Sequence, residues 1–152
     1  MQKSTLYIAS TSFAFFSALS VYWLLTNKSY DGMTVLMFGP IKFDLKYAIN
    51  SGINFGIAGE DSSLRQILLA LVALAVVGLM SVWSFSKPNK YHVFFTAIFC
   101  GGGLSNAYER VVYGGVFDYL NVSLIFYQNP FSFNLADIYI FLGLVFLVFL
   151  PK

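Results

Sequence analysis

The sequence predicts an all-α membrane protein: a four-helix transmembrane bundle with a small extracytoplasmic β-hairpin, or cradle, and an interfacial segment. The first observation is composition, since 58% of the 152 residues are hydrophobic and only 11% are charged, whereas about 25% is usual in soluble domains. The second is a pair of uncharged runs, 5–25 and 67–86, each long enough for the roughly 20 residues that a spanning helix needs. Two shorter runs, 91–110 and 134–150, are more polar at one end. We therefore expect a single integral membrane domain over 1–152.

The first run could be a signal peptide, because it follows only the four residues MQKS. Its apolar core exceeds the roughly 7–15 residues of such a peptide, and an Ala-x-Ala-like cleavage site is not obvious. We therefore predict a retained helix.

Four spanning helices place both termini on one side, together with the short link SKPNK at 86–90. That side carries Lys3, Lys87, Lys90 and Lys152, while the other carries Lys28, Lys42, Lys46 and Arg65 among acids. The count of basic residues is nearly equal, and the shortness of the link favours cytoplasmic termini.

A β region is expected at about 31–60, between the first two helices. The stretch IKFDLKYA at 41–48 alternates apolar and charged residues, which is typical of a half-buried strand. With TVLMF before it and Gly39-Pro40 as a turn, it predicts a hairpin. Isolated hairpins are marginal in water, so this one should lie on the helices or on the membrane surface. The later loop, 114–133, mixes aromatic residues with Asn and Ser and predicts a short interfacial segment.

Two aspartates stand out in a chain that otherwise avoids charge. Asp118 follows the third predicted helix, and Asp137 lies in the first turn of the fourth. Because the segment between them does not cross the membrane and the two helices are expected to be neighbours, both carboxyls should meet at the outer face. Each acid could instead simply reach water, and the helix dipole would also explain Asp137.

Two close carboxyls cannot both ionise cheaply, so they share a proton and titrate as a pair. One can then take a proton from water while the other gives one to a peptide carbonyl, which is the chemistry of an aspartic protease. The nearby amides Asn106 and Asn134 could fix a substrate backbone or a developing oxyanion.

Four short motifs give these residues a family context. In order, the chain reads NSGINF, NAYER, VFDYL and FNLAD. They resemble the Asn-x-Gly-x-x-Phe, Asn-x-x-Asp-Arg, Val-Asp-Phe-like and Phe-Asn-x-Ala-Asp boxes of signal peptidase II, the bacterial lipoprotein signal peptidase. The resemblance runs from about the hairpin to the fourth helix, and FNLAD is its most specific part.

The resemblance implies a four-helix aspartyl endopeptidase of the bacterial cytoplasmic (inner) membrane, a multi-pass protein whose active site lies at the extracytoplasmic face. Such an enzyme removes the signal peptide of a prolipoprotein just before a diacylglyceryl-modified cysteine. The implied catalytic residues are Asp118 and Asp137. The implied substrate-binding or supporting residues are Asn50, Gly52, Phe55, Asn106, Arg110 and Asn134.

The same resemblance implies neither a metal nor an organic cofactor. Its implied partners are the lipid-modified prolipoprotein and membrane lipid, while partners in a membrane complex stay open. A nucleic-acid partner is not expected, because the sequence has no basic cluster.

Three departures from the family pattern keep an alternative open. The family's first helix bears an Asp followed four residues later by a Lys, whereas this helix is uncharged and has LSVYW at about that place. Glu109 replaces the Asp before Arg110, and Asn54 stands where a small residue is usual. The alternative is a non-catalytic structural or assembly subunit of a membrane complex; retention of both aspartates favours the peptidase.

Other protease chemistries fit the sequence less well. The only histidine, His92, and Ser105 of GLSN lie thirteen residues apart on one predicted helix, about 20 Å at 1.5 Å per residue. A helical metalloprotease motif needs two histidines. A proton-coupled carrier also fits less well, because four helices with acids near the surface leave no path across the membrane.

Overall fold

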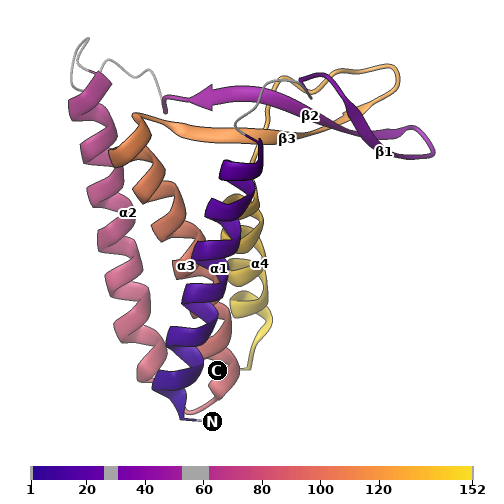
Figure 1. The fold of residues 1–152 in the computed structure, drawn as a ribbon. Helices are drawn as coiled ribbons and strands as arrows, with labels where there is room; N and C mark the ends of the chain where they lie inside the picture. The colour runs from indigo at the N-terminus through magenta and orange to yellow at the C-terminus, as the bar shows by residue number, and fades with distance from the viewer. Residues whose placement is uncertain (1, 26–30, 53–61, 152) are drawn as a thin grey trace.

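The structure is a computed structural model that describes residues 2–25, 31–52 and 62–151. Within these residues the helices are α1 (Lys3–Leu25), α2 (Ser62–Phe85), α3 (Lys90–Tyr113) and α4 (Leu135–Phe149), and the strands are β1 (Thr34–Phe38), β2 (Ile41–Asn50) and β3 (Val116–Leu124). The helices form a bundle, and the sheet lies across the end opposite both termini (Figure 1).

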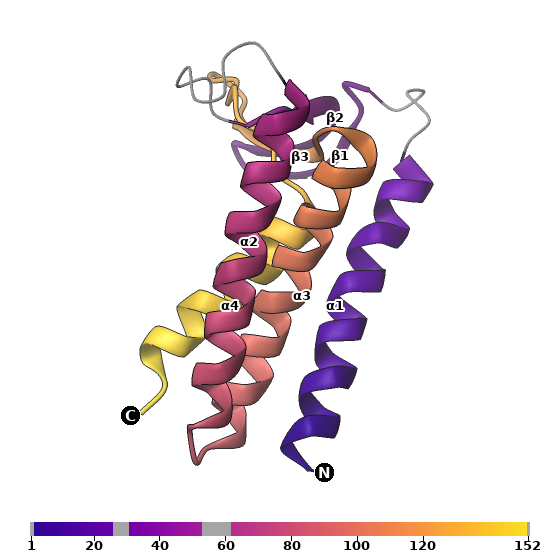
Figure 2. The same cartoon turned by 90° about the vertical axis from the view of Figure 1, so that its left-hand side faces the viewer.

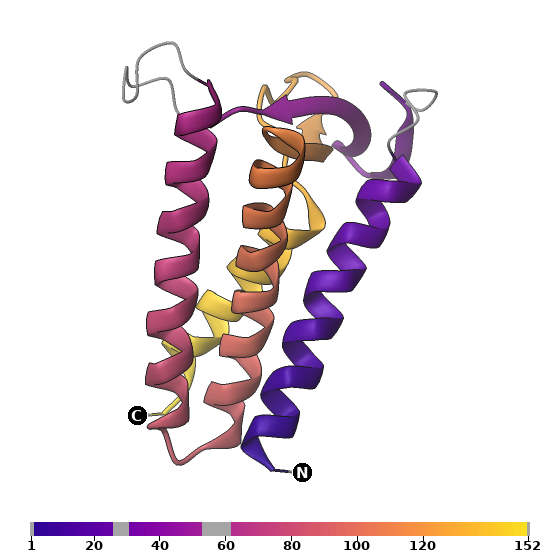
Figure 3. The same ribbon diagram turned by 60° about the vertical axis from the view of Figure 1, so that its left-hand side comes forward.

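Helix α3 is the centre of the bundle and packs against α1, α2 and α4. Figures 2 and 3 show it between α1 and α2, with α4 behind. Small residues allow this close packing: a Cβ on Gly101 would lie 2.6 Å from Cβ of Ala14, and one on Gly102 would lie 2.4 Å from the carbonyl oxygen of Ala136. The two glycines therefore let α1 and α4 approach α3 directly.

The outward faces of the helices are apolar. Exposed residues include Phe13 and Phe16 on α1, Leu79 and Val82 on α2, and Phe141 and Val148 on α4. By length and composition, two helices in the described part of the chain could cross a bilayer, Lys3–Leu25 and Ser63–Phe85. Helix α4 is shorter but also apolar. A helix that stays apolar on its outer side fits a lipid environment.

The predicted hairpin is confirmed. Strands β1 and β2 are antiparallel, with Phe38 paired to Ile41 around the turn at Gly39 and Pro40. The expected alternation of a buried and a solvated face is not seen in β2, because every residue from 41 to 48 is half-buried.

Within the predicted interfacial segment 114–133, residues 116–124 form strand β3, which the sequence did not predict. This strand is antiparallel to β2, with Ala48 opposite Asp118 and Asn50 opposite Val116, so the sheet has the order β1-β2-β3. Residues 116–119 are all buried. Apolar residues lie on both sides of the strand, which suits this buried position. From the sequence alone, without knowledge of the partner strand, the mixture of apolar residues with Asn and Ser resembles an interfacial segment.

Candidate active site

Asp118 is placed by the junction of α3 with the sheet. Helix α3 ends at Gly114, whose φ of 75° is the left-handed conformation that commonly ends helices. The chain then enters β3, and pairing with β2 places Asp118 opposite Ala48. The side chain is almost fully buried, with an exposure of 4%.

Asp137 is placed by the start of α4. Asn134 caps this helix: its Oδ1 accepts the backbone N–H of Asp137 at 2.9 Å, and Asp137 Oδ2 accepts the backbone N–H of Asn134 at 3.2 Å. This reciprocal capping box satisfies amides that have no helical partner. The hydroxyl of Tyr119 accepts the N–H of Leu135 at 2.9 Å, and Phe133 pairs with Leu120, so β3 fixes the first turn of α4.

A chain of hydrogen bonds connects the two carboxyls through amide side chains. Asn50 and Asn134 donate to Asp118 at 3.0 Å and 3.1 Å. Asn106 donates to Asp137 Oδ1 at 2.8 Å and accepts from Asn134 Nδ2 at 3.1 Å. Asn134 therefore contacts both acids, and residues from β2, α3, β3 and the start of α4 meet at one place.

The surroundings of Asp118 favour its protonated form. Burial raises the pKa of this carboxyl from its ordinary 3.8 to about 6, and the nearby charge of Asp137 raises it further, against the lowering effects of Asn50, Arg110 and Asn134. The charge of Asp137 thus acts on the carboxyl of Asp118.

Arg110 fixes the loop that follows β2. Its Nη1 donates to Gln66 Oε1 at 2.8 Å, and Gln66 Nε2 donates to the carbonyl oxygen of Ser51 at 2.6 Å. The next residue, Gly52, has a φ of 87°, and its N–H donates to Asn50 Oδ1 at 2.9 Å. The loop is thus held where Asn50 can reach Asp118.

A cavity of about 460 Å³ opens beside Asp118. Its walls come from the end of β2, from Leu69, from Arg110 and from residues 130–132. A smaller hollow of about 280 Å³ lies beside Asp137, between Phe133, Ile138 and Phe141. The carboxyls therefore lie next to space in which an extended peptide and apolar groups could bind.

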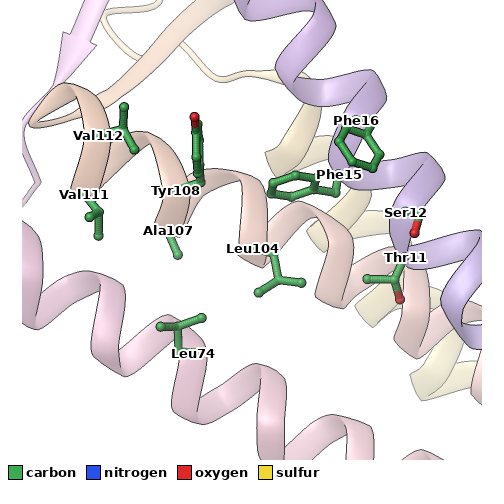
Figure 4. Close-up of a pocket in the computed structure, with 10 residues that line it drawn as sticks. All are labelled: Thr11, Ser12, Phe15, Phe16, Leu74, Leu104, Ala107, Tyr108, Val111 and Val112. Atoms are coloured by element: carbon green, nitrogen blue, oxygen red, sulfur yellow. The ribbon is translucent and has the colours of Figure 1, made fainter.

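A third cavity, also of about 460 Å³, lies between α1, α2 and α3 (Figure 4). It is lined by aliphatic and aromatic side chains with the hydroxyls of Thr11, Ser12 and Tyr108, and its lining contains no acid, amide or cation. We therefore place the candidate active site at the aspartates and not in this groove.

The structure brings together most of the residues that the sequence singled out. Asp118, Asp137, Asn50, Asn106 and Asn134 share the hydrogen-bonded chain described above, while Gly52 and Arg110 line the cavity with Asp118. Phe55, like Asn54, lies outside the described residues.

Three further side chains support the site, and of these the sequence singled out only Glu109, as a departure from the family pattern. Gln66 is buried and connects Arg110 to Ser51, Tyr119 caps α4, and Glu109 accepts the backbone N–H of Phe117 at 2.9 Å. The only sequence signal for Gln66 is its position, since it is a polar residue directly before the apolar run 67–86. Among the described residues, no three His, Cys, Asp or Glu side chains group as metal ligands would.

The chain is similar to known proteins over most of its length. The family model described as signal peptidase (SPase) II matches residues 14–150. A lipoprotein signal peptidase of Vibrio parahaemolyticus is 32% identical over 80% of this chain and 72% of its own length. Another, of Pseudomonas aeruginosa, is 34% identical over 71% of this chain and 65% of its own.

Solved structures show the same fold. A structure of a bacterial membrane enzyme superposes with a TM-score of 0.73 at 18% identity, covering 93% of this chain and 89% of the other. A second such structure gives 0.68 at 19% identity, covering 93% and 84%. The match of a family model to nearly the whole chain, together with relatives above 30% identity, shows that this chain belongs to the signal peptidase II family.

Proposed function

We propose that the chain is an aspartyl endopeptidase that removes signal peptides from diacylglyceryl-modified prolipoproteins, with Asp118 and Asp137 as its catalytic residues. The observation that carries this proposal is the position of Asn134, which donates to Asp118 and forms a capping box with Asp137. Membership of the family and the names of its relatives support the reaction and the lipoprotein substrate.

The reaction needs one proton on the pair of carboxyls. A water molecule between them loses a proton to the ionised carboxylate as its oxygen attacks the scissile carbonyl carbon, and the protonated partner donates to the carbonyl oxygen. The tetrahedral intermediate then collapses and the C–N bond breaks: the leaving amine takes a proton from one carboxyl, and a hydroxyl of the intermediate gives its proton to the other, which restores the single proton of the pair. The raised pKa of Asp118 favours keeping that one proton at the site.

The amides and Arg110 have supporting roles in this proposal. Asn50, Asn106 and Asn134 hold the carboxyls in place. Arg110 and Gly52 line the cavity next to Asp118, where the guanidinium can bind a carbonyl of an extended peptide. Phe55 completes the family's first box.

In this proposal all four helices span the bacterial cytoplasmic membrane, in contact with membrane lipid, and the sheet lies at the extracytoplasmic face. Two helices meet the length and composition of a span. Lys3 begins α1, Lys87 lies in the link between α2 and α3, and Lys90 begins α3; the N-terminal end of the chain lies opposite the sheet (Figure 1). Lysines near short loops favour a cytoplasmic location. Both termini are then cytoplasmic.

The experiment is a cleavage assay with purified protein in detergent or lipid. The substrate is a prolipoprotein whose cysteine carries diacylglycerol, and the control is the same precursor without lipid. We expect the shortened product from the lipidated precursor, and little or none from the control. If neither precursor is cut under conditions in which an established member of the family cuts the first, the proposed function is wrong.

A further inference from the structure

Glu109 is a buried acid that the proposed chemistry does not use. It lies on α3 with an exposure of 3%, and its Oε2 accepts the backbone N–H of Phe117 at 2.9 Å. Phe117 directly precedes Asp118 in β3. Glu109 therefore holds the strand at the residue next to a proposed catalytic carboxyl.

The ring of Phe117 is held as well. It meets Tyr22 of α1 edge-on, with ring centroids 5.8 Å apart, and Tyr47 of β2 at 5.0 Å. Tyr22 in turn stacks on Tyr113, the last residue of α3, at 4.4 Å and an angle of 9°. Aromatic pairs at such distances stabilise beyond the area they bury, so three elements converge on Phe117.

These contacts join positions at which the chain departs from its family pattern. Glu109 stands in place of Asp in the box read here as NAYER, and the residue that it holds, Phe117, lies in the box read as VFDYL. Tyr22 belongs to LSVYW, at about the place of the family's charged pair on the first helix. The longer acid of α3 and the aromatic residue of α1 thus both contact Phe117.

We infer that Glu109 and Phe117 are positioning residues for the dyad, which act by fixing the start of β3 so that Asp118 meets Asn50 and Asn134. This inference rests on the proposed function. Tyr22 connects α1 to the same strand by ring contacts, in place of a charged pair.

The test of Glu109 separates the reach of the side chain from its charge. Glu109→Gln keeps an acceptor oxygen at the same distance and loses the charge, whereas Glu109→Asp keeps the charge and withdraws the acceptor by about one C–C bond length, about 1.5 Å. We expect Glu109→Gln to keep kcat within about threefold of the parent, and Glu109→Asp to lower kcat at least about tenfold with little change in KM. The reverse order, or two variants that both match the parent, overturns the inference.

A second test combines a substitution of Phe117 with one of Glu109. Phe117→Val and Glu109→Asp should combine to less than the product of their separate losses in kcat, because both release the same strand. Losses that multiply independently would show that the two residues do not act as a unit.

Hydrogen exchange tests the positioning role of Glu109 independently of whether the proposed function is right. Activity of the parent protein tests the function, whereas exchange of the amides at 116–120 tests the positioning even without activity. Exchange should be faster in Glu109→Asp than in the parent and nearly unchanged in Glu109→Gln, with thermal midpoints showing that both variants fold. Equal exchange in all three proteins overturns the inference.

Discussion

At the scale of single residues, the buried carboxyl of Asp118 makes the stability of the folded protein depend on pH. Burial raises its pKa from 3.8 to about 6, with a further contribution from Asp137, so the folded protein binds this proton more tightly than the unfolded chain does. Between about pH 4 and pH 6 the folded state holds more protons, and its stability therefore falls as the pH rises. A pKa that rises from 3.8 to about 6 corresponds to a loss on the order of 3 kcal/mol.

The variant Asp118→Asn isolates this effect because it cannot titrate. We expect the free energy of unfolding of the parent, relative to that of the variant, to decline from pH 4 to pH 6 and to level off above. Denaturant unfolding in micelles at pH 4, 5, 6 and 7 measures the difference. A difference that stays constant with pH would contradict the burial argument for this carboxyl.

Gly52 is the residue that shapes the loop beside Asp118. An alanine there would adopt a φ of 87°, and its Cβ would lie 2.6 Å from Leu69 Cδ1. We expect Gly52→Ala to lower stability by about 1–3 kcal/mol and to raise KM, because the cavity wall must move. Gly32→Ala is the matched control: its φ is 79° but nothing lies within 4 Å of the added atom. Equal effects of the two substitutions on KM would show that contact at Gly52 is unimportant.

At the scale of elements, the contact of α3 with α4 decides where Asp137 lies. A Cβ on Gly102 would lie 2.4 Å from the carbonyl oxygen of Ala136, in the first turn of α4. Gly102→Ala must therefore displace this turn, and we expect a loss of about 1–3 kcal/mol in stability together with a clear loss of cleavage.

The control for this prediction is Gly78→Ala on α2, where an added Cβ meets nothing within 4 Å. It should fold and cleave like the parent. Thermal unfolding and the cleavage rate, measured on both variants, check the pair. Full activity of Gly102→Ala would mean that α4 tolerates displacement and that the position of Asp137 is not set by this contact.

The sequence predicted the presence of the helices more accurately than the residues at which they begin and end. The spans expected at 67–86 and 91–110 correspond to helices at Ser62–Phe85 and Lys90–Tyr113. Apolar content sets the predicted limits, whereas the first turn of α2 and the last turns of α3 contain polar residues that still make helical bonds. Strand β3 was missed because its partner β2 lies far away in the sequence, and only that pairing distinguishes it from an interfacial segment.

Short sequence motifs predicted the main residues of the candidate site. The aspartates and asparagines stand in short boxes that the sequence displays. Tyr119 and Glu109 also lie in these boxes, but they and Gln66 act on backbone groups elsewhere in the chain, so their roles follow from the packing of the fold.

At the scale of the whole molecule, the proposal places the sheet outside and both termini inside the cell. Figure 1 shows the sheet at one end of the bundle and the termini at the other. Cys100 is a buried free cysteine, so single cysteines introduced at the surface can be labelled above a low background.

We expect a membrane-impermeant maleimide to label Met33→Cys in intact cells, because Met33 is exposed near the sheet. Lys90→Cys, at the start of α3, should be labelled only after the membrane is opened. The parent, with Cys100 alone, is the control for both. Labelling of Lys90→Cys in intact cells, with Met33→Cys protected, would reverse the proposed orientation.

The central claim is that Asp118 and Asp137 act together as one catalytic pair. The most direct measurement is the cleavage rate of a diacylated prolipoprotein by purified Asp118→Asn and Asp137→Asn, beside the parent and with thermal midpoints to show that each variant folds. We expect the cleavage rate of each variant to be lower than that of the parent by at least about a thousandfold, since each acid moves a proton in the reaction. A folded variant of either aspartate that cleaves at the rate of the parent would contradict it.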